Sequence, residues 1–369
     1  MIFYLQSLIL AAFAVFLFQR GGSIRGAHLL MILAWLFGVS LIYFFYGPVG
    51  QLAFYQNDQR IHWAIVSSGY SSSDLGTGFD RFNSLRVPYT LPALLLTKLG
   101  FDVTVSLKFV SLCCALATMT VVEKFLESES QKFAVLSFWL VAGPSLTFFS
   151  ILALRETMMV LLVVLLAFGR YQAGKPIYLI GLILLKPHLG ASVIFGQVWG
   201  WVFSKTPRHW HLSATLLSCV APVLLGSISF AAGNYFLYGT SFNLDQGLIL
   251  KEQIVKVFSG FVGLQFLTVA YQTVEFSVSS LLLIRARFPE IVVVPLLFLI
   301  ACTFVTPRHS QLRLGTLASF VFFSAISSGT EFMSFRQSLS FMPVMGVLAI
   351  LTFSEIRGTA EPSVKRSST

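Results

Sequence analysis

Charged residues are scarce in this chain of 369 residues. Lys, Arg, Asp and Glu together make up 11% of it, hydrophobic residues make up 56%, and the mean hydropathy is +0.81. A soluble domain has about 25% charged and about 45–50% apolar residues, so this chain carries more apolar surface than a water-soluble core can hide. The composition excludes a soluble enzyme, a disordered protein and a secreted disulfide scaffold. It favours a polytopic membrane protein.

Several chemical signatures are also missing. The chain has no Walker A loop, no GxGxxG opening a helix, no HExxH and no CxxC, which argues against ATP, dinucleotide or zinc chemistry. It has no basic aromatic stripe of the kind that binds nucleic acid. The four cysteines lie inside apolar runs and are typical of small buried residues: Cys113, Cys114, Cys219 and Cys302. We therefore expect no cofactor, no metal site and no nucleic-acid partner.

Long apolar runs, in contrast, are abundant. About 20 apolar residues are needed to cross the hydrocarbon of a bilayer. Such runs predict transmembrane or re-entrant helices at 2–18, 27–46, 103–122, 133–151, 152–169, 176–203, 212–231, 257–283, 291–305, 315–328 and 337–352. The predicted fold class is thus all-α, with about 10–11 such helices in a single transmembrane domain over 1–353. Residues 354–369 are polar and predict a disordered tail.

The net charge of +10 is explained by the excess of Lys and Arg on cytoplasmic loops of membrane proteins. Arg20 and Arg25 lie between the first two runs, so this connection is predicted inside and the N-terminus outside. The apolar start has its charge after the run rather than before it, unlike a cleavable signal peptide. Segment 47–102 then becomes a large outer loop containing a short interfacial helix, and the C-terminal tail is cytoplasmic.

One run, 176–203, is interrupted in its middle by Lys186-Pro187-His188 and Gly190. Pro removes a backbone donor and Gly loosens the next turn, so we expect a broken helix. Two half-helices that return to the same side satisfy the positive-inside rule, because Lys175 and Lys205 flank the run. This hairpin version requires the run 291–305 to re-enter as well. A single tilted span is the alternative.

Ionisable groups inside membrane spans are costly and are functional candidates by default. Several of them fall at similar depth toward the outer face, which is the main sequence evidence for a site. The set comprises Lys108, Arg155, Glu156, Lys186, His188, Glu275, Glu331 and Arg336.

Each candidate also has a structural interpretation. Lys186 would snorkel from a kinked span while His188 bonds a neighbouring helix. Arg155 with Glu156 would form a local ion pair at a helix end, and Arg336 would be an interfacial anchor. In the outer loop, Asp58 stands in an aromatic context and is a candidate proton acceptor, although most loop carboxylates are simply solvated.

The segment FFSILALRETMMVLLVVLLAFGRYQAGKPIYLIGLILLKPHLGASVIF resembles bacterial polysaccharide polymerases of the Wzy-like type, including the exopolysaccharide-polymerase branch. In that family an Arg followed by a polar residue opens a span, a short basic loop follows, and the next span is broken near a His followed by small residues. Here these residues are Arg155, His188 and the small residues from Gly190 on. Asp58 with a downstream aromatic and the late Arg336 also fit. Two features depart from the pattern: Glu156 replaces the usual Gln, and Lys186-Pro187 is more like the broader GT-C glycosyltransferases.

The resemblance implies a GT-C-like membrane glycosyltransferase in the bacterial cytoplasmic (inner) membrane, acting on polyprenyl-(pyro)phosphate-linked sugars at the outer face. Its role would be repeat-unit polymerisation in polysaccharide biosynthesis. Substrate-binding residues would be Arg155, Glu156, Lys186 and Arg336, and catalytic residues Asp58 and His188. The implied partners are the lipid-linked saccharide donor and acceptor, membrane lipid, a flippase and a chain-length regulator. Transfer of single sugars is one alternative, and a transporter or flippase of lipid-linked saccharide is another.

Overall fold

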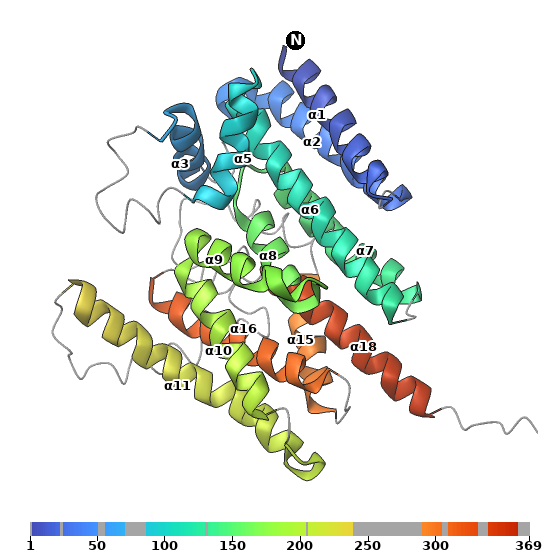
Figure 1. Cartoon of the computed structure of the whole chain (residues 1–369), viewed down its shortest axis with the longest axis vertical. Coiled ribbons are helices and arrows are strands. Elements are labelled where there is room, and N and C mark those ends of the chain that lie inside the picture. The colour runs from blue at the N-terminus through green and yellow to red at the C-terminus, as the bar shows by residue number, and fades with distance from the viewer. Residues whose placement is uncertain are drawn as a thin grey trace, which may run out of the picture. The chain divides into compact units, whose positions relative to one another are not determined.

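The computed structural model describes residues 2–22, 25–50, 56–70, 86–129, 132–203, 206–238, 290–304, 309–330 and 339–360 (Figure 1). Regular structure in these ranges is helical, and no strand occurs among them. The prediction of an all-α protein is thereby confirmed for the described part of the chain. Its residues fall into two compact units, one of 1–191 with 339–343 and one of 192–338 with 344–369.

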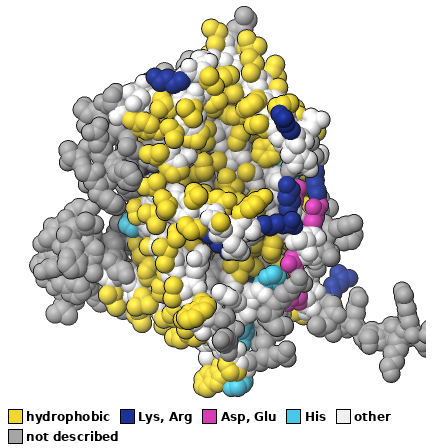
Figure 2. All heavy atoms as spheres, in the orientation of Figure 1, with side chains coloured by type: hydrophobic (Ala, Val, Ile, Leu, Met, Phe, Trp, Pro, Cys, Tyr) yellow, Lys and Arg dark blue, Asp and Glu magenta, His cyan; other side chains and the backbone are white. Residues whose placement is uncertain are grey.

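Three of the described helices are long and apolar enough to cross a membrane: α1 (Ile2–Arg20), α2 (Gly26–Gly50) and α6 (Val103–Ser128). On α1 and α2 most of the surface is not covered by protein, and large apolar side chains such as Leu30 and Phe37 are each 68% exposed. Hydrophobic side chains spread over most of the face drawn in Figure 2. Such surfaces need an apolar environment, which supports membrane association. The type of membrane and the orientation stay predictions.

The first unit contains further helices. They are α3 (Gln56–Ser67), α5 (Val87–Lys98), α7 (Lys132–Ile151), α8 (Glu156–Phe168), the 3-10 helix η3 (Gln172–Gly174) and α9 (Lys175–Leu185). Among its described residues, the predicted outer loop 47–102 holds α3 as well as α5, which is the short helix expected there. The runs 133–151 and 152–169 correspond to α7 and α8, which are separated by a four-residue junction at 152–155.

Helix α6 is the centre of the first unit, where α1, α2, α3, α5, α7 and α8 pack against it. Asp102 caps its N-terminus, since the carboxylate accepts hydrogen bonds from the amides of Thr104 and Val105 at 2.8 and 3.2 Å. The side chain of Gln6 on α1 donates to the Gly100 carbonyl and accepts from the Asp102 amide. These bonds fix α1 to the start of α6.

The second unit contains most of α10 (Pro187–Phe203), the 3-10 helix η4 (Arg208–Trp210), α11 (His211–Tyr238), α15 (Glu290–Thr303), α16 (Ser310–Thr330) and α18 (Met342–Ala360). Helices α10 and α16 cross at glycines: a Cβ on Gly196 would lie 2.3 Å from the Gly315 carbonyl oxygen, and one on Gly200 would lie 2.4 Å from that of Gln311. Only glycine permits this approach. The buried Arg313 joins α15, α16 and α18 by donating to the Ala301 carbonyl and to Thr352.

Some predictions fall outside the described residues, namely the helix at 257–283 and the end of the tail. Helix α18 continues to Ala360, beyond the expected end of the last span. The single domain over 1–353, the tail over 354–369 and the membrane sidedness of each segment stay predictions.

Candidate functional site

The structure describes four of the six predicted site residues in full. Arg155 is the N-cap of α8 and Glu156 is its first residue. Lys186 lies between α9 and α10, and His188 is exposed in the first turn of α10. Asp58 belongs to α3, but its side chain is outside the described set, and Arg336 with Glu275 and Glu331 lies outside the described residues.

The predicted break at Lys186 is present. Its backbone is extended, with φ −158° and ψ 98°, and α10 starts at Pro187. The amides of Leu189 and Gly190 bond to the Lys186 carbonyl, which leaves the Leu185 carbonyl at the end of α9 without a helical partner. The Nη1 of Arg155 donates to this Leu185 oxygen. Arg155 therefore completes the end of α9, and the structure brings together two of the elements singled out in the sequence.

The chain turns sharply at this break. A Cβ on Gly190 would lie 2.4 Å from Cγ1 and 3.2 Å from Cα of Ile183. Residues seven apart in an unbroken helix are separated by about 10.5 Å along its axis. Close contact between Ile183 and Gly190 thus requires that the start of α10 folds back on the end of α9, and glycine makes room for it. Whether the arms return to one side of a membrane stays a prediction.

His62, which lies in α3, is fully buried and links two further elements to this region. Its Nδ1 is 2.9 Å from the Ala153 carbonyl oxygen and its Nε2 is 2.7 Å from Nη1 of Arg86. A carbonyl only accepts and a guanidinium only donates, so Nδ1 carries the proton and Nε2 is the acceptor. His62 is therefore neutral. It holds Arg86 beside the α7–α8 junction, since its other partner, Ala153, lies two residues before Arg155.

Arg86 has an unusual backbone conformation at the N-cap of α5. Its φ of 50° and ψ of 42° are left-handed, a region that costs a non-glycine residue about 1–2 kcal/mol. The Arg86 carbonyl accepts hydrogen bonds from the amides of Tyr89 and Thr90. A strained cation held by a buried histidine is typical of a functional position.

Tyr89 on α5 and Ser111 on α6 link these helices to the α7–α8 junction by hydrogen bonds. The Tyr89 hydroxyl donates to the Leu107 carbonyl at 3.1 Å and lies 2.9 Å from Oγ of Ser111, which donates to the Leu154 carbonyl at 3.2 Å. Burial raises the pKa of the Tyr89 phenol well above its ordinary value, and the negative charge of nearby Glu156 adds to the rise. The carboxylate of Glu156, itself buried, thus faces the same region.

We call this set the junction cluster: His62, Arg86, Tyr89, Ser111, Arg155 and Glu156. It contains two guanidinium groups, a neutral imidazole and a buried carboxylate around residues 152–155. Such a set can bind an anion and handle a proton. His62, Arg86 and Tyr89 were not among the candidates from sequence, and the available signal was weak: polar residues in an otherwise apolar protein. No group of three His, Cys, Asp or Glu side chains is arranged to hold a metal within the described ranges.

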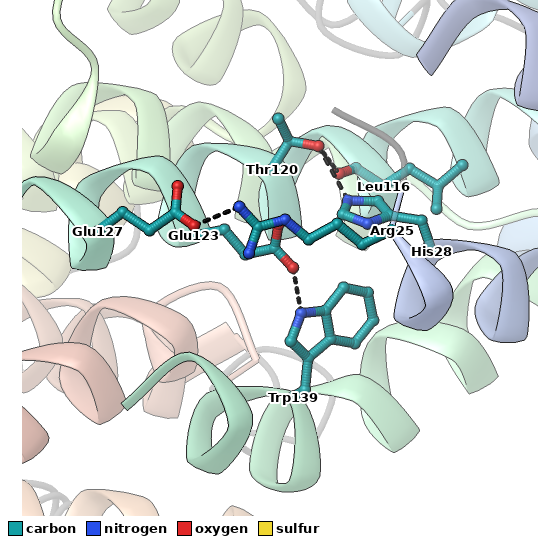
Figure 3. A network of polar contacts seen from close by, with 7 residues as sticks. All are labelled: Arg25, His28, Leu116, Thr120, Glu123, Glu127 and Trp139. Carbon is teal, nitrogen blue, oxygen red and sulfur yellow. Dashed lines mark hydrogen bonds and ion pairs between the residues drawn. The ribbon is translucent and has the colours of Figure 1, made fainter. Parts of the chain in front are cut away.

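A second polar network joins the start of α2 to α6 and α7 (Figure 3). Arg25 pairs with Glu127 and, at 3.4 Å, with Glu123, whose other oxygen accepts from the Trp139 indole. His28 bonds to Thr120 at 3.1 Å. The hydrogen bond that Arg25 donates to Glu127 raises the pKa of Arg25 above its ordinary value, and the charge of Glu123 acts in the same direction. Every charge here has an opposite partner, so the network suits helix docking.

Function has to be inferred from the chemistry of the junction cluster. Its residues come from α3, α5, α6 and α8, within one compact unit. The resemblance to Wzy-like polymerases stays an expectation based on the residues quoted for it. Comparisons with protein-family models, with curated proteins and with solved structures found no match to this chain.

Proposed function

We propose that this protein is a membrane glycosyltransferase that uses polyprenyl-(pyro)phosphate-linked sugars, and that it polymerises polysaccharide repeat units. The single observation that carries the proposal is the junction cluster. Two guanidinium groups, those of Arg86 and Arg155, are each fixed by a hydrogen bond near the α7–α8 junction. The apolar surfaces of α1 and α2 support a location in a membrane, where a lipid-linked substrate resides.

Fixed cations suit the leaving group of this reaction. When the bond between the anomeric carbon and the phosphate oxygen breaks, negative charge grows on the phosphate. Guanidinium groups that are already oriented in a region of low dielectric stabilise such charge without reorganising. Arg also presents a planar fork that matches phosphate oxygens. We assign Arg155 and Arg86 to this role, with Lys186 beside the Leu185 carbonyl and Arg336 as further candidates.

The acceptor sugar must lose a proton when its hydroxyl oxygen bonds to the anomeric carbon. A base within hydrogen-bond reach would take that proton while the electron pair of the breaking bond leaves with the phosphate. Asp58 and His188 are the candidates from sequence. The neutral form of His62 is already committed to Ala153 and Arg86, so it positions Arg86 rather than accepting the proton.

Removal of the candidate residues in cells tests the proposal. Arg155→Ala and His188→Ala are expected to abolish polymer formation while the amount of protein in the membrane stays normal, as measured by gel analysis of the polysaccharide and by immunoblotting. Full-length polymer from both variants would contradict the site. In sealed vesicles, movement of the lipid-linked saccharide without a new glycosidic bond would instead identify a transporter. Products extended by one sugar would identify a single-sugar transferase.

A further inference from the structure

Gln59 on α3 is a buried polar side chain. It is fully buried, and neither Oε1 nor Nε2 has a hydrogen-bond partner among the residues that the structure describes. Buried amides are normally satisfied, because leaving donor and acceptor groups without partners in an apolar interior is unfavourable. An unsatisfied glutamine that serves only packing would be poorer than a leucine of similar size. A ligand with hydroxyl groups would satisfy both atoms of this amide.

Helix α3 buries polar and apolar residues together: Ile65 and Val66 are 0% and 1% exposed, whereas Arg60 is exposed. Gln59 and His62, three residues apart and so on one face, are completely buried. Ile61 and Trp63 are 40% and 42% exposed. In a membrane protein, polar groups face the interior or a cavity while apolar groups face lipid. The inward side of α3 is therefore mixed, and Gln59 is a buried polar group on it that the described residues leave without a hydrogen bond.

The position of Gln59 along α3 relates it to the phosphate-binding groups. It lies one turn before His62, which holds Arg86. Three residues of helix advance about 4.5 Å, which is comparable with the width of one sugar ring. An amide at this spacing suits the sugar of a sugar phosphate whose phosphate is held by Arg86.

The chemistry of the amide selects the ligand class. Gln offers two N–H donors and one carbonyl acceptor in a plane. Adjacent sugar hydroxyls, each both donor and acceptor, satisfy all of these groups, whereas a phosphate would leave the amide oxygen facing negative charge. We propose that Gln59 binds hydroxyl groups of the saccharide and so determines which sugar is accepted. This rests on the proposed function, since it concerns the substrate of the same site.

The test compares Gln59→Leu with Gln6→Leu, a matched change at a glutamine whose amide is satisfied by Gly100 and Asp102. Purified variants would be heated in detergent with undecaprenyl diphosphate, or with lipid-linked saccharide extracted from cells that lack this protein. We expect Gln59→Leu to unfold at the same or a higher temperature than wild type, because an unsatisfied group is removed. Gln6→Leu should unfold at a lower temperature and should keep its ligand response.

The deciding measurement is how much each ligand raises the unfolding temperature of Gln59→Leu. Wild type should be stabilised more by the lipid-linked saccharide than by undecaprenyl diphosphate, and Gln59→Leu should be stabilised equally by both while its polymer formation falls at least tenfold. If Gln59→Leu retains the wild-type preference or forms polymer at the wild-type rate, the proposal for Gln59 is wrong. A lower unfolding temperature for Gln59→Leu would mark a structural residue and also overturn it. If wild type forms no glycosidic bond but keeps the preference, the proposed function fails and the saccharide contact stands.

Discussion

Arg155 donates a hydrogen bond from Nη1 to the carbonyl oxygen of Leu185, thirty residues later in the chain. This carbonyl is available because Lys186 is extended and the amide of Leu189, which would bond to Leu185 in a continuous helix, bonds to the Lys186 carbonyl instead. One guanidinium thus connects the start of α8 with the broken end of α9. Arg155, a candidate because of its charge, and the helix break at Lys186-Pro187 therefore belong to one local structure.

Two substitutions of Arg155 distinguish the contribution of its positive charge from that of its planar guanidinium. Arg155→Lys keeps the positive charge but lacks the planar fork that could bond to Leu185 and a phosphate at once. We therefore expect its rate of polymer formation to fall by about tenfold to a hundredfold. Arg155→Ala removes the charge as well, so its rate should fall by about 10²–10³-fold. The measurement is the rate of polymer formation in membranes containing equal amounts of protein. Arg170→Ala, at an exposed arginine after α8, should have no effect. Equal activity of Arg155→Lys and wild type would contradict the bidentate role.

The left-handed backbone of Arg86 gives a second prediction. Arg86→Gly relieves the strain and Arg86→Ala keeps it, so the glycine variant should be more stable by about 1–2 kcal/mol. Both variants lack the guanidinium and should lose polymer formation to a similar extent. Thermal unfolding in detergent and the polymer assay check the two parts. If activity instead follows the order of stability, Arg86 acts through the fold and not on the substrate.

The network in Figure 3 predicts non-additive stability effects. Arg25→Ala leaves the Glu123 carboxylate, whose side chain is only 3% exposed, without its cation, and should cost about 2 kcal/mol. Glu123→Gln in the same protein should restore most of that loss. Glu127→Ala should cost less than about 1 kcal/mol, because this carboxylate is 41% exposed. Equal, additive losses in the double variant would show that the pair is not coupled.

Packing of α10 on α16 depends on glycine. A Cβ at Gly196 would lie 1.8 Å from Oγ of Ser319 and 2.3 Å from the Gly315 carbonyl oxygen, so Gly196→Ala should lower the free energy of unfolding by about 1–3 kcal/mol. The control is Gly26→Ala at the start of α2, where nothing lies within 4 Å of the new Cβ. Denaturation in detergent measures both. An unchanged stability for Gly196→Ala would argue against close contact of the two helices.

The sequence alone determined the features that depend on local chemistry. Long apolar runs form helices because the backbone must satisfy its own hydrogen bonds in an apolar medium. Pro187 removes a backbone donor and so favours the break at Lys186, although Pro144 and Pro222 lie inside α7 and α11. The apolar runs predicted a boundary between residues 151 and 152, with Arg155 and Glu156 near the start of the next helix. The structure adds that 152–155 form a junction, so that α8 begins at Glu156.

Only the tertiary structure decided which polar groups meet. The partners of His62 lie 24 and 91 residues away, and hydropathy shows that a segment is buried without showing what it is buried against. Helix α3 is the clearest case: its sequence is that of a polar outer segment, yet Gln59 and His62 are buried while Trp63 is exposed. This burial comes from packing on α5 and α6, because each helix orients its faces according to its neighbours.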